Sequence, residues 1–189
     1  MTPYWQGKLV RLRALEPEDA EHFYHLNLER DVDRSLEMVY PPSSLSRQQE
    51  WVEKAAKEGF GENQSFRFQI EELASGHLVG SIDTHHCDPR VGTFEYGLSV
   101  REQYRGHGFA ADAILMVLRY YFLELRYQKA NPGVFAFNDA SIRLHEKLGF
   151  VLEGTRRRSG YSNGQFHDML LFGMTVEEFR DLHADYLTL

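Results

Sequence analysis

A glycine-containing loop is the segment of the sequence best suited to binding a charged ligand. It separates an alternating, strand-like stretch that ends at Val100 from a helical pattern that begins at Ala110. Glycines let the backbone turn tightly and approach a ligand closely, and the free N–H groups and dipole at the start of a helix favour an anion. We therefore expect the loop to bind a phosphate or pyrophosphate group. Its residues are Arg105, Gly106, His107, Gly108, Phe109 and Ala110.

The same loop matches the G-x-G-x-x-A fingerprint of dinucleotide-binding folds at residues 106–111. In those folds the glycines directly follow the first strand of a βαβ unit, and an acidic residue ends the next strand. Here the polar-rich residues 101–105 intervene after a strand that closes a meander, and the next strand ends at Phe137 and Asn138. These departures disfavour a nicotinamide site.

A second set of polar residues lies on one face of a predicted helix. Asn138, Ser141 and His145 are spaced i, i+3 and i+7, which places them on one stripe and suggests that they line a site. Asn138 is also a good helix N-cap, with Ser141 at position N3. Asn138 could therefore serve equally as a helix cap or as a contact to a ligand. His145 could donate a proton near neutral pH or could be a surface residue with no role.

A third set of ionisable residues lies on two neighbouring strands. Glu95 is the best candidate for a general base that takes a proton through a water molecule, with Asp83, His85 and His86 as alternatives. Successive residues of a strand face opposite ways, so we expect that His85 and His86 do not enter one pocket. This expectation, and the lack of a spaced ligand pair, disfavour a zinc site that would include Cys87. We expect no metal.

The periodicity of the chain predicts the elements that position these residues. Alternating patterns predict strands at residues 8–13, 65–71, 78–84, 93–100 and 134–137, and the turn at Asn163 and Gly164 predicts a final hairpin. Helical patterns fall on residues 110–125, 138–148 and 176–186, and two more helices precede the second strand, so that the order is β-α-α-β-β-β-α-β-α-β-β. This order predicts an α/β (α+β) fold with a mixed, mostly antiparallel sheet of about six to seven strands flanked by helices. With no linker or repeat, residues 1–189 are expected to form one domain.

Two motifs resemble those of the GNAT superfamily of acyl-CoA N-acyltransferases. Residues 98–110 are similar to its strand followed by R/Q-x-x-G-x-G/A, and residues 134–150 are similar to its second acetyl-CoA segment. Residues 7–13 and the final hairpin also resemble the RimJ/RimL branch, whose members acetylate N-terminal amines of ribosomal proteins. The likeness covers nearly the whole chain and implies the GNAT fold.

The resemblance also implies a chemistry, which is direct transfer of an acetyl group from acetyl-CoA to an amine, without Cys87 as a nucleophile. It implies that two parallel strands splay beside Val100 and admit the pantetheine, with Leu98 and Val100 flanking the acetyl group. A strand amide there would bond the thioester oxygen, residues 105–110 would hold the pyrophosphate, and Asn138 and Ser141 would contact the coenzyme. Many members carry a tyrosine that protonates the leaving thiolate where this chain has His145. Either His145 replaces that tyrosine as the catalytic acid, or solvent or Ser141 supplies the proton.

The expected acceptor is a protein or peptide N-terminal amine, and the alternatives are a polyamine or antibiotic amine. A protein that binds acetyl-CoA without turnover is a further alternative. We expect the acceptor pocket to form from the first two helices, residues 40–42 and the final hairpin with its turn at Asn163 and Gly164. Either a monomer or a homodimer is compatible with the sequence.

The composition limits the partners. Lys and Arg total 21 against 28 Asp and Glu, and the net charge of -7 argues against nucleic acid while it is compatible with a cationic substrate. No run approaches the roughly 18 apolar residues of a membrane span, and no secretory signal is visible. With one cysteine and no disulfide framework, a cytoplasmic location is expected.

Overall fold

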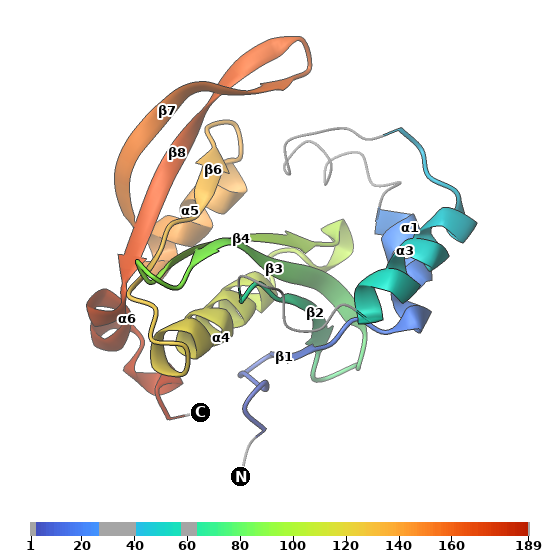
Figure 1. The fold of residues 1–189 in the computed structure, drawn as a ribbon, viewed down its shortest axis with the longest axis horizontal. Helices are drawn as coiled ribbons and strands as arrows, with labels where there is room; N and C mark the ends of the chain where they lie inside the picture. Colours follow the sequence, from blue (N-terminus) through green and yellow to red (C-terminus); the bar gives the residue numbers. More distant parts are fainter. Residues whose placement is uncertain (1–2, 27–40, 58–63, 189) are drawn as a thin grey trace.

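The computed structural model describes residues 3–26, 41–57 and 64–188, and within them an eight-stranded mixed sheet with helices on its faces. The strand order is β1-β2-β3-β4-β5-β8-β6, with β7 paired to β8 (Figure 1). This is the predicted GNAT fold. Tyr40, one of the residues expected at the acceptor pocket, lies outside the described residues. No described helix combines the length and the apolar character needed to cross a membrane.

The first half of the sheet is antiparallel, and in it the first strand of the chain extends the three-strand meander that is predicted within residues 65–100. It consists of β1 (Val10–Arg13), β2 (Arg67–Glu72), β3 (Leu78–Asp88) and β4 (Thr93–Val100). The apolar helix α4 (Phe109–Leu123) covers one face, where Phe94 stacks on Tyr121 with ring centroids 4.0 Å apart. Helices α1 (Ala20–Leu26) and α3 (Leu45–Lys57) lie beside β1 and β2 (Figure 1). The guanidinium of Arg67 in β2 sits over the ring of Trp51 in α3.

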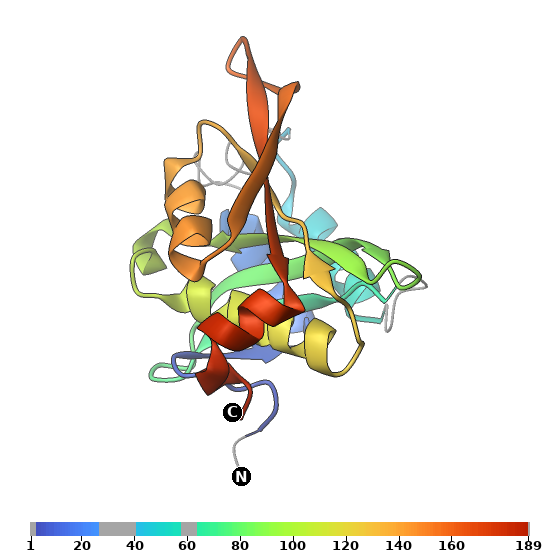
Figure 2. The same ribbon diagram turned by 90° about the vertical axis from the view of Figure 1, so that its left-hand side faces the viewer.

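The second half of the sheet contains one strand more than the sequence predicts. The strand expected at residues 134–137 is preceded by the short β5 (Lys129–Ala130) and is itself β6 (Gly133–Phe135). Asn131 and Pro132 separate the two strands, and proline has no N–H to continue a ladder. The final hairpin is formed by β7 (Val151–Ser162) and β8 (Gln165–Thr175), and it extends beyond the rest of the sheet (Figure 2).

A gap opens between β4 and β6. Strand β4 pairs in parallel with β5 only at Phe94 and the preceding Thr93, whereas β6 pairs only with β8. The carbonyl of Phe94 accepts the N–H of Asn131 at 2.8 Å, so the peptide groups of Phe94 point toward this side of the strand. Because peptide groups alternate in direction along a strand, those of Tyr96, Leu98 and Val100 point into the gap.

The remaining helices close the ends of the molecule. Helix α5 (Asp139–Leu148) ends at Gly149, whose φ of 87° gives the left-handed C-terminal cap that glycine favours. Helix α6 (Val176–Leu182) follows β8 behind a capping box of Thr175 and Glu178. At the hairpin turn, Asn163 and Gly164 both have positive φ, at 51° and 77°, as a type I′ turn requires.

A buried carboxylate joins the N-terminal segment to the core. Asp112 in α4 is 2% exposed and accepts the backbone N–H groups of Lys8, Leu9 and Val10 at 2.6–3.1 Å. It also accepts the hydroxyl of Tyr186 at 2.6 Å. One side chain therefore fixes β1 and the C-terminal turn against the start of α4, next to the glycine loop.

Candidate active site

A cavity of about 760 Å³ fills the gap between β4 and β6. Its lining residues include parts of β4, the glycine loop, α5 and the stem of the β7–β8 hairpin. All predicted site residues except His107 line it, and these are Glu95, Leu98, Val100, Arg105, Gly106, Gly108, Phe109, Ala110, Asn138, Ser141 and His145. Residues far apart in the sequence thus meet at one place, as the resemblance implies.

The glycine loop presents backbone N–H groups to this cavity. Gly106 and Gly108 have φ of 80° and 87°, which only glycine adopts without strain, and Gly108 caps α4 with no side-chain hydrogen bond. Within the described ranges, no acceptor bonds the N–H groups of Gly106, His107 or Gly108. The loop therefore fits a phosphate group, with uncapped donors and a helix dipole behind them. The imidazole Nδ1 of His107 instead lies 3.2 Å from the carbonyl of Tyr104.

The edge of β4 forms the middle of the cavity. Every residue from Glu95 to Val100 lines it, although neighbours in a strand face opposite ways. Side chains on both faces of β4 can line one cavity because this edge of the strand is unpaired. The cavity passes around the edge and reaches both faces of the sheet. The N–H of Leu98 points into the gap and is available to a carbonyl oxygen. The splayed strands and this free edge fit a pantetheine arm laid beside β4.

The polar face of α5 combines a cap with a cavity lining. The Oδ1 of Asn138 accepts the N–H of Ser141 at 3.0 Å, which confirms the N-cap that the sequence predicts. Both residues line the cavity as well, so the two alternatives hold together. The Oγ of Ser141 lies 3.4 Å from Nδ1 of His145, one turn further along.

His145 is not a surface residue, and that alternative was wrong. It is 2% exposed and packs between the rings of Tyr96 and Phe172. Its Nδ1 lies 2.8 Å from the carbonyl of Ser141, which only accepts, so Nδ1 carries the hydrogen and Nε2 is an acceptor. The hydroxyl of Tyr96 donates to that Nε2 at 3.0 Å. Burial lowers the pKa of His145 and raises that of Tyr96, so both are neutral near pH 7.

Three ionisable side chains meet at the other end of the strand edge. The Oε2 of Glu95 lies 3.8 Å from Nε2 of His85 and 3.3 Å from Nδ1 of His86. The expectation that the two histidines face different pockets was wrong, because both line the cavity. A β-bulge between His85 and Asp88, with His86 at φ 47°, interrupts the alternation.

Cys87 lies on the core side of that bulge. Its sulfur is buried 3.6 Å from the hydroxyl of Tyr121, and burial raises the pKa of the thiol. A buried neutral thiol is a poor nucleophile, in agreement with direct transfer.

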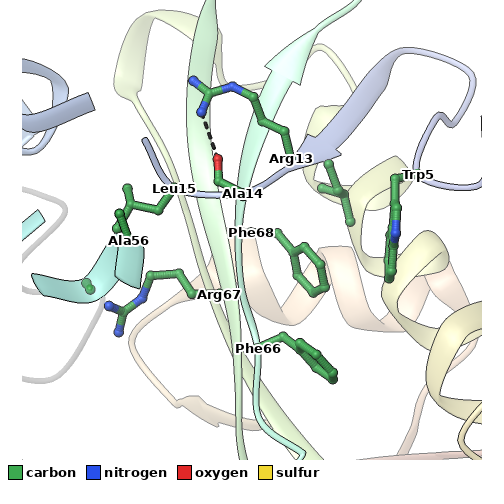
Figure 3. Close-up of a pocket in the computed structure, with 10 residues that line it drawn as sticks. Trp5, Arg13, Ala14, Leu15, Ala56, Phe66, Arg67 and Phe68 are labelled. Atoms are coloured by element: carbon green, nitrogen blue, oxygen red, sulfur yellow. Dashed lines mark hydrogen bonds between the residues drawn. The ribbon is translucent and has the colours of Figure 1, made fainter. Parts of the chain in front are cut away.

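A second cavity of about 360 Å³ lies between β1, β2 and α3, and Figure 3 shows the aromatic rings of Trp5, Phe66 and Phe68 along it. None of the predicted site residues lines it. Within the described residues, α3 contributes Ala55 and Ala56 to this smaller cavity, whereas neither α1 nor α3 lines the larger one. The final hairpin, which is expected from the sequence at the acceptor pocket, contributes Arg156, Ser159 and Met169 to the larger cavity.

Residues 10–151 match the model of the acetyltransferase (GNAT) domain. This chain belongs to the GNAT acetyltransferase family. A Bacillus subtilis relative, the SPbeta prophage-derived uncharacterized N-acetyltransferase YokL, is 46% identical over 96% of this chain and 98% of its own length. The spermidine N(1)-acetyltransferase of Escherichia coli is 25% identical over 85% of this chain and 83% of its own.

A solved structure agrees with the family assignment. The spermidine N-acetyltransferase of Vibrio cholerae in complex with CoA and spermine superposes with a TM-score of 0.77 at 25% identity, covering 90% of this chain and 97% of that one. As a GNAT enzyme, this chain is an acetyl-CoA-dependent N-acetyltransferase, and its co-substrate is acetyl-CoA rather than a nicotinamide dinucleotide.

Proposed function

We propose that this GNAT enzyme acetylates the N-terminal amine of a protein or peptide, as members of the RimJ/RimL branch do, with residues 1–189 acting as one domain. The observation that supports this proposal is the cavity that passes around the free edge of β4. It has the uncapped glycine loop at one end and Glu95 at the other. A coenzyme and an acceptor can therefore approach β4 from two directions and meet beside Leu98.

In this proposal each polar group has one task. Bound acetyl-CoA supplies the acetyl group as a thioester. The carboxylate of Glu95 takes a proton from the acceptor ammonium through a water molecule, and the freed nitrogen forms the new C–N bond as the C–S bond breaks. The N–H of Leu98 donates to the carbonyl oxygen as it gains negative charge. The hydroxyl of Ser141 gives a proton to the departing sulfur and regains one from the new amide nitrogen, which must lose its second proton to become a neutral amide.

His145 would act through its neighbours rather than as the acid itself. Its Nδ1–H is bonded to the carbonyl of Ser141 and its Nε2 accepts from Tyr96, so no ring proton is left for the thiolate. We propose that it fixes the first turns of α5 and, with them, the position of the Ser141 hydroxyl. It is in this sense a positioning residue.

A polyamine is the second candidate acceptor. Asp83 and Glu95 place two carboxylates near the acceptor end, where His85 lies 3.5 Å from Asp83 and 3.8 Å from Glu95. Carboxylates attract a polycation. Spermidine acetyltransferases are also among the relatives by sequence and by structure.

A thiol-release assay with acetyl-CoA decides among the candidates. The panel holds a lysine-free peptide with a free N-terminus, the same peptide with a blocked N-terminus, and spermidine. We expect release with the free peptide and none with the blocked one. Release with spermidine alone would replace the first candidate by the second. If the chain is stabilised by CoA against heat yet releases no thiol with any amine, it is a non-catalytic binding module and the proposal fails.

A further inference from the structure

His85, His86 and Glu95 form a cluster whose geometry goes beyond a general base and its neighbours. His85 and Glu95 are cross-strand partners on β3 and β4, and the bulge brings His86 to the same side. The ligand atoms of all three lie within 4.8 Å of one another. Without the left-handed backbone at His86, strand alternation would have turned its ring away.

The spacing of the cluster suits a transition-metal ion. Zn²⁺ binds imidazole nitrogen and carboxylate oxygen at about 2.0–2.1 Å in a tetrahedron, which sets neighbouring ligand atoms about 3.3 Å apart. The measured separations from Glu95 Oε2 are 3.3 Å to His86 Nδ1 and 3.8 Å to His85 Nε2. Small rotations of these partly exposed side chains would complete the three-ligand set. Two imidazoles and one carboxylate are a donor set that zinc takes in proteins.

A fourth residue supports the orientation of one ligand. The Nδ1 of His85 lies 3.5 Å from Oδ2 of Asp83, while its Nε2 is directed toward Glu95. A carboxylate behind a ligating histidine fixes the ring and its tautomer in metal sites. Gly97 lies opposite Asp83 and has no side chain to fill the space beside them, so a water molecule or an acceptor can occupy the open position.

We infer that His85, His86 and Glu95 bind one divalent transition-metal ion of the Zn²⁺ class, which inhibits acetyl transfer. An ion on Glu95 blocks the carboxylate from taking a proton and occupies the space through which an amine approaches. The inhibition rests on the proposed role of Glu95 as the base, whereas the binding does not.

Metal binding is measured on the full chain, without a polyhistidine tag and after EDTA treatment and dialysis. Zn²⁺ titrated by calorimetry should bind one ion per chain at this cluster, and Co²⁺ should give visible absorption bands of a low-coordinate site. His86→Asn removes a ligand while it keeps a residue that tolerates positive φ, and it should weaken binding at least tenfold. Asp83→Asn should weaken it about tenfold through the loss of the supporting carboxylate.

Two controls separate this site from other donors. His77→Asn removes an exposed histidine outside the cluster, and Cys87→Ser removes the buried thiol, and neither should change the affinity. No binding by the parent chain, or equal binding by the parent and His86→Asn, would overturn the inference.

Activity provides a separate readout. Zn²⁺ should inhibit competitively with the amine and not with acetyl-CoA, and inhibition that competes with acetyl-CoA instead would refute the inhibitory role. If no amine is acetylated by the metal-free chain, the proposed function fails, yet the calorimetric and Co²⁺ measurements still decide whether the ion binds.

Discussion

The hydroxyl of Tyr96 on β4 donates to Nε2 of His145 on α5 at 3.0 Å, and the two rings stack at an interplanar angle of 15°. This contact crosses from the splayed strand to the helix that carries Ser141. It joins the two walls of the cavity with a hydrogen bond that is buried at both ends. The contact therefore fixes α5 against β4, while the backbone edge of β4 that faces the gap stays unpaired.

The buried imidazole predicts a dependence of stability on pH. Burial lowers the pKa of His145 below the 6.5 of an exposed histidine, so the unfolded chain binds its proton first as the pH falls. Its contribution to stability is thus present above about pH 6.5 and is lost at lower pH. We expect the free energy of unfolding in urea to fall between pH 7 and pH 5 by more in the parent than in His145→Gln. Parallel curves for the two chains would contradict a buried neutral histidine.

The glycine loop predicts a selective loss of coenzyme affinity. Gly106→Ala places a Cβ on a residue with φ 80°, and this left-handed backbone conformation costs a non-glycine residue about 1–2 kcal/mol. The strain would change the direction in which the N–H groups of the loop point. We expect the Kd for CoA, measured by calorimetry, to rise about tenfold. Gly76→Ala is the matched control, because Gly76 has φ 73° with open space around it and lies in the turn between β2 and β3. Equal Kd changes in both variants would mean that the loop does not hold the coenzyme.

The role of Glu95 predicts a change in kinetics without a change in CoA affinity. Glu95→Gln, assayed with EDTA present, should lower kcat/KM about 10²-fold and leave the Kd for CoA unchanged. Glu124→Gln changes an exposed carboxylate at the end of α4 and should leave both unchanged. A kcat/KM of Glu95→Gln that equals the parent's would assign the base to another group.

The buried carboxylate of Asp112 predicts a loss of stability. Asp112→Asn leaves one oxygen for four donors, the N–H groups of residues 8–10 and the hydroxyl of Tyr186. We expect the free energy of unfolding to fall by about 3 kcal/mol, since hydrogen bonds to a charged group contribute about 1.5–3 kcal/mol each. Tyr186→Phe should cost about half of that, and the exposed Asp181→Asn close to nothing. A Tm shift in Asp181→Asn as large as in Asp112→Asn would show that the contacts of Asp112 are not responsible.

The sequence by itself determined the features that depend on local backbone chemistry. The glycine loop, the Asn138 cap, the Gly149 cap and the turn at Asn163 and Gly164 all require particular φ values or particular side chains, and these requirements can be read from neighbouring residues. The alternating and helical periods determined the order of elements, and with it the fold class. Eleven of the twelve residues that the sequence singles out as catalytic or cofactor-binding line one cavity of the structure.

The tertiary structure alone decided the features that depend on contacts across the fold. Helical spacing put His145 on a polar stripe, but only the packing of α5 against β4 and β8 showed that it is buried and bonded at both nitrogens. Strand alternation separated His85 from His86, and only a bulge against β4 brought both to Glu95. The division at Pro132 likewise became visible through strand pairing, because β5 pairs with both β4 and β8, whereas β6 pairs only with β8. A local sequence pattern predicts which face of a regular helix or strand a side chain lies on. Burial, bulges and the geometry of a ligand set depend on contacts between elements that are far apart in the sequence, so the pattern does not predict them.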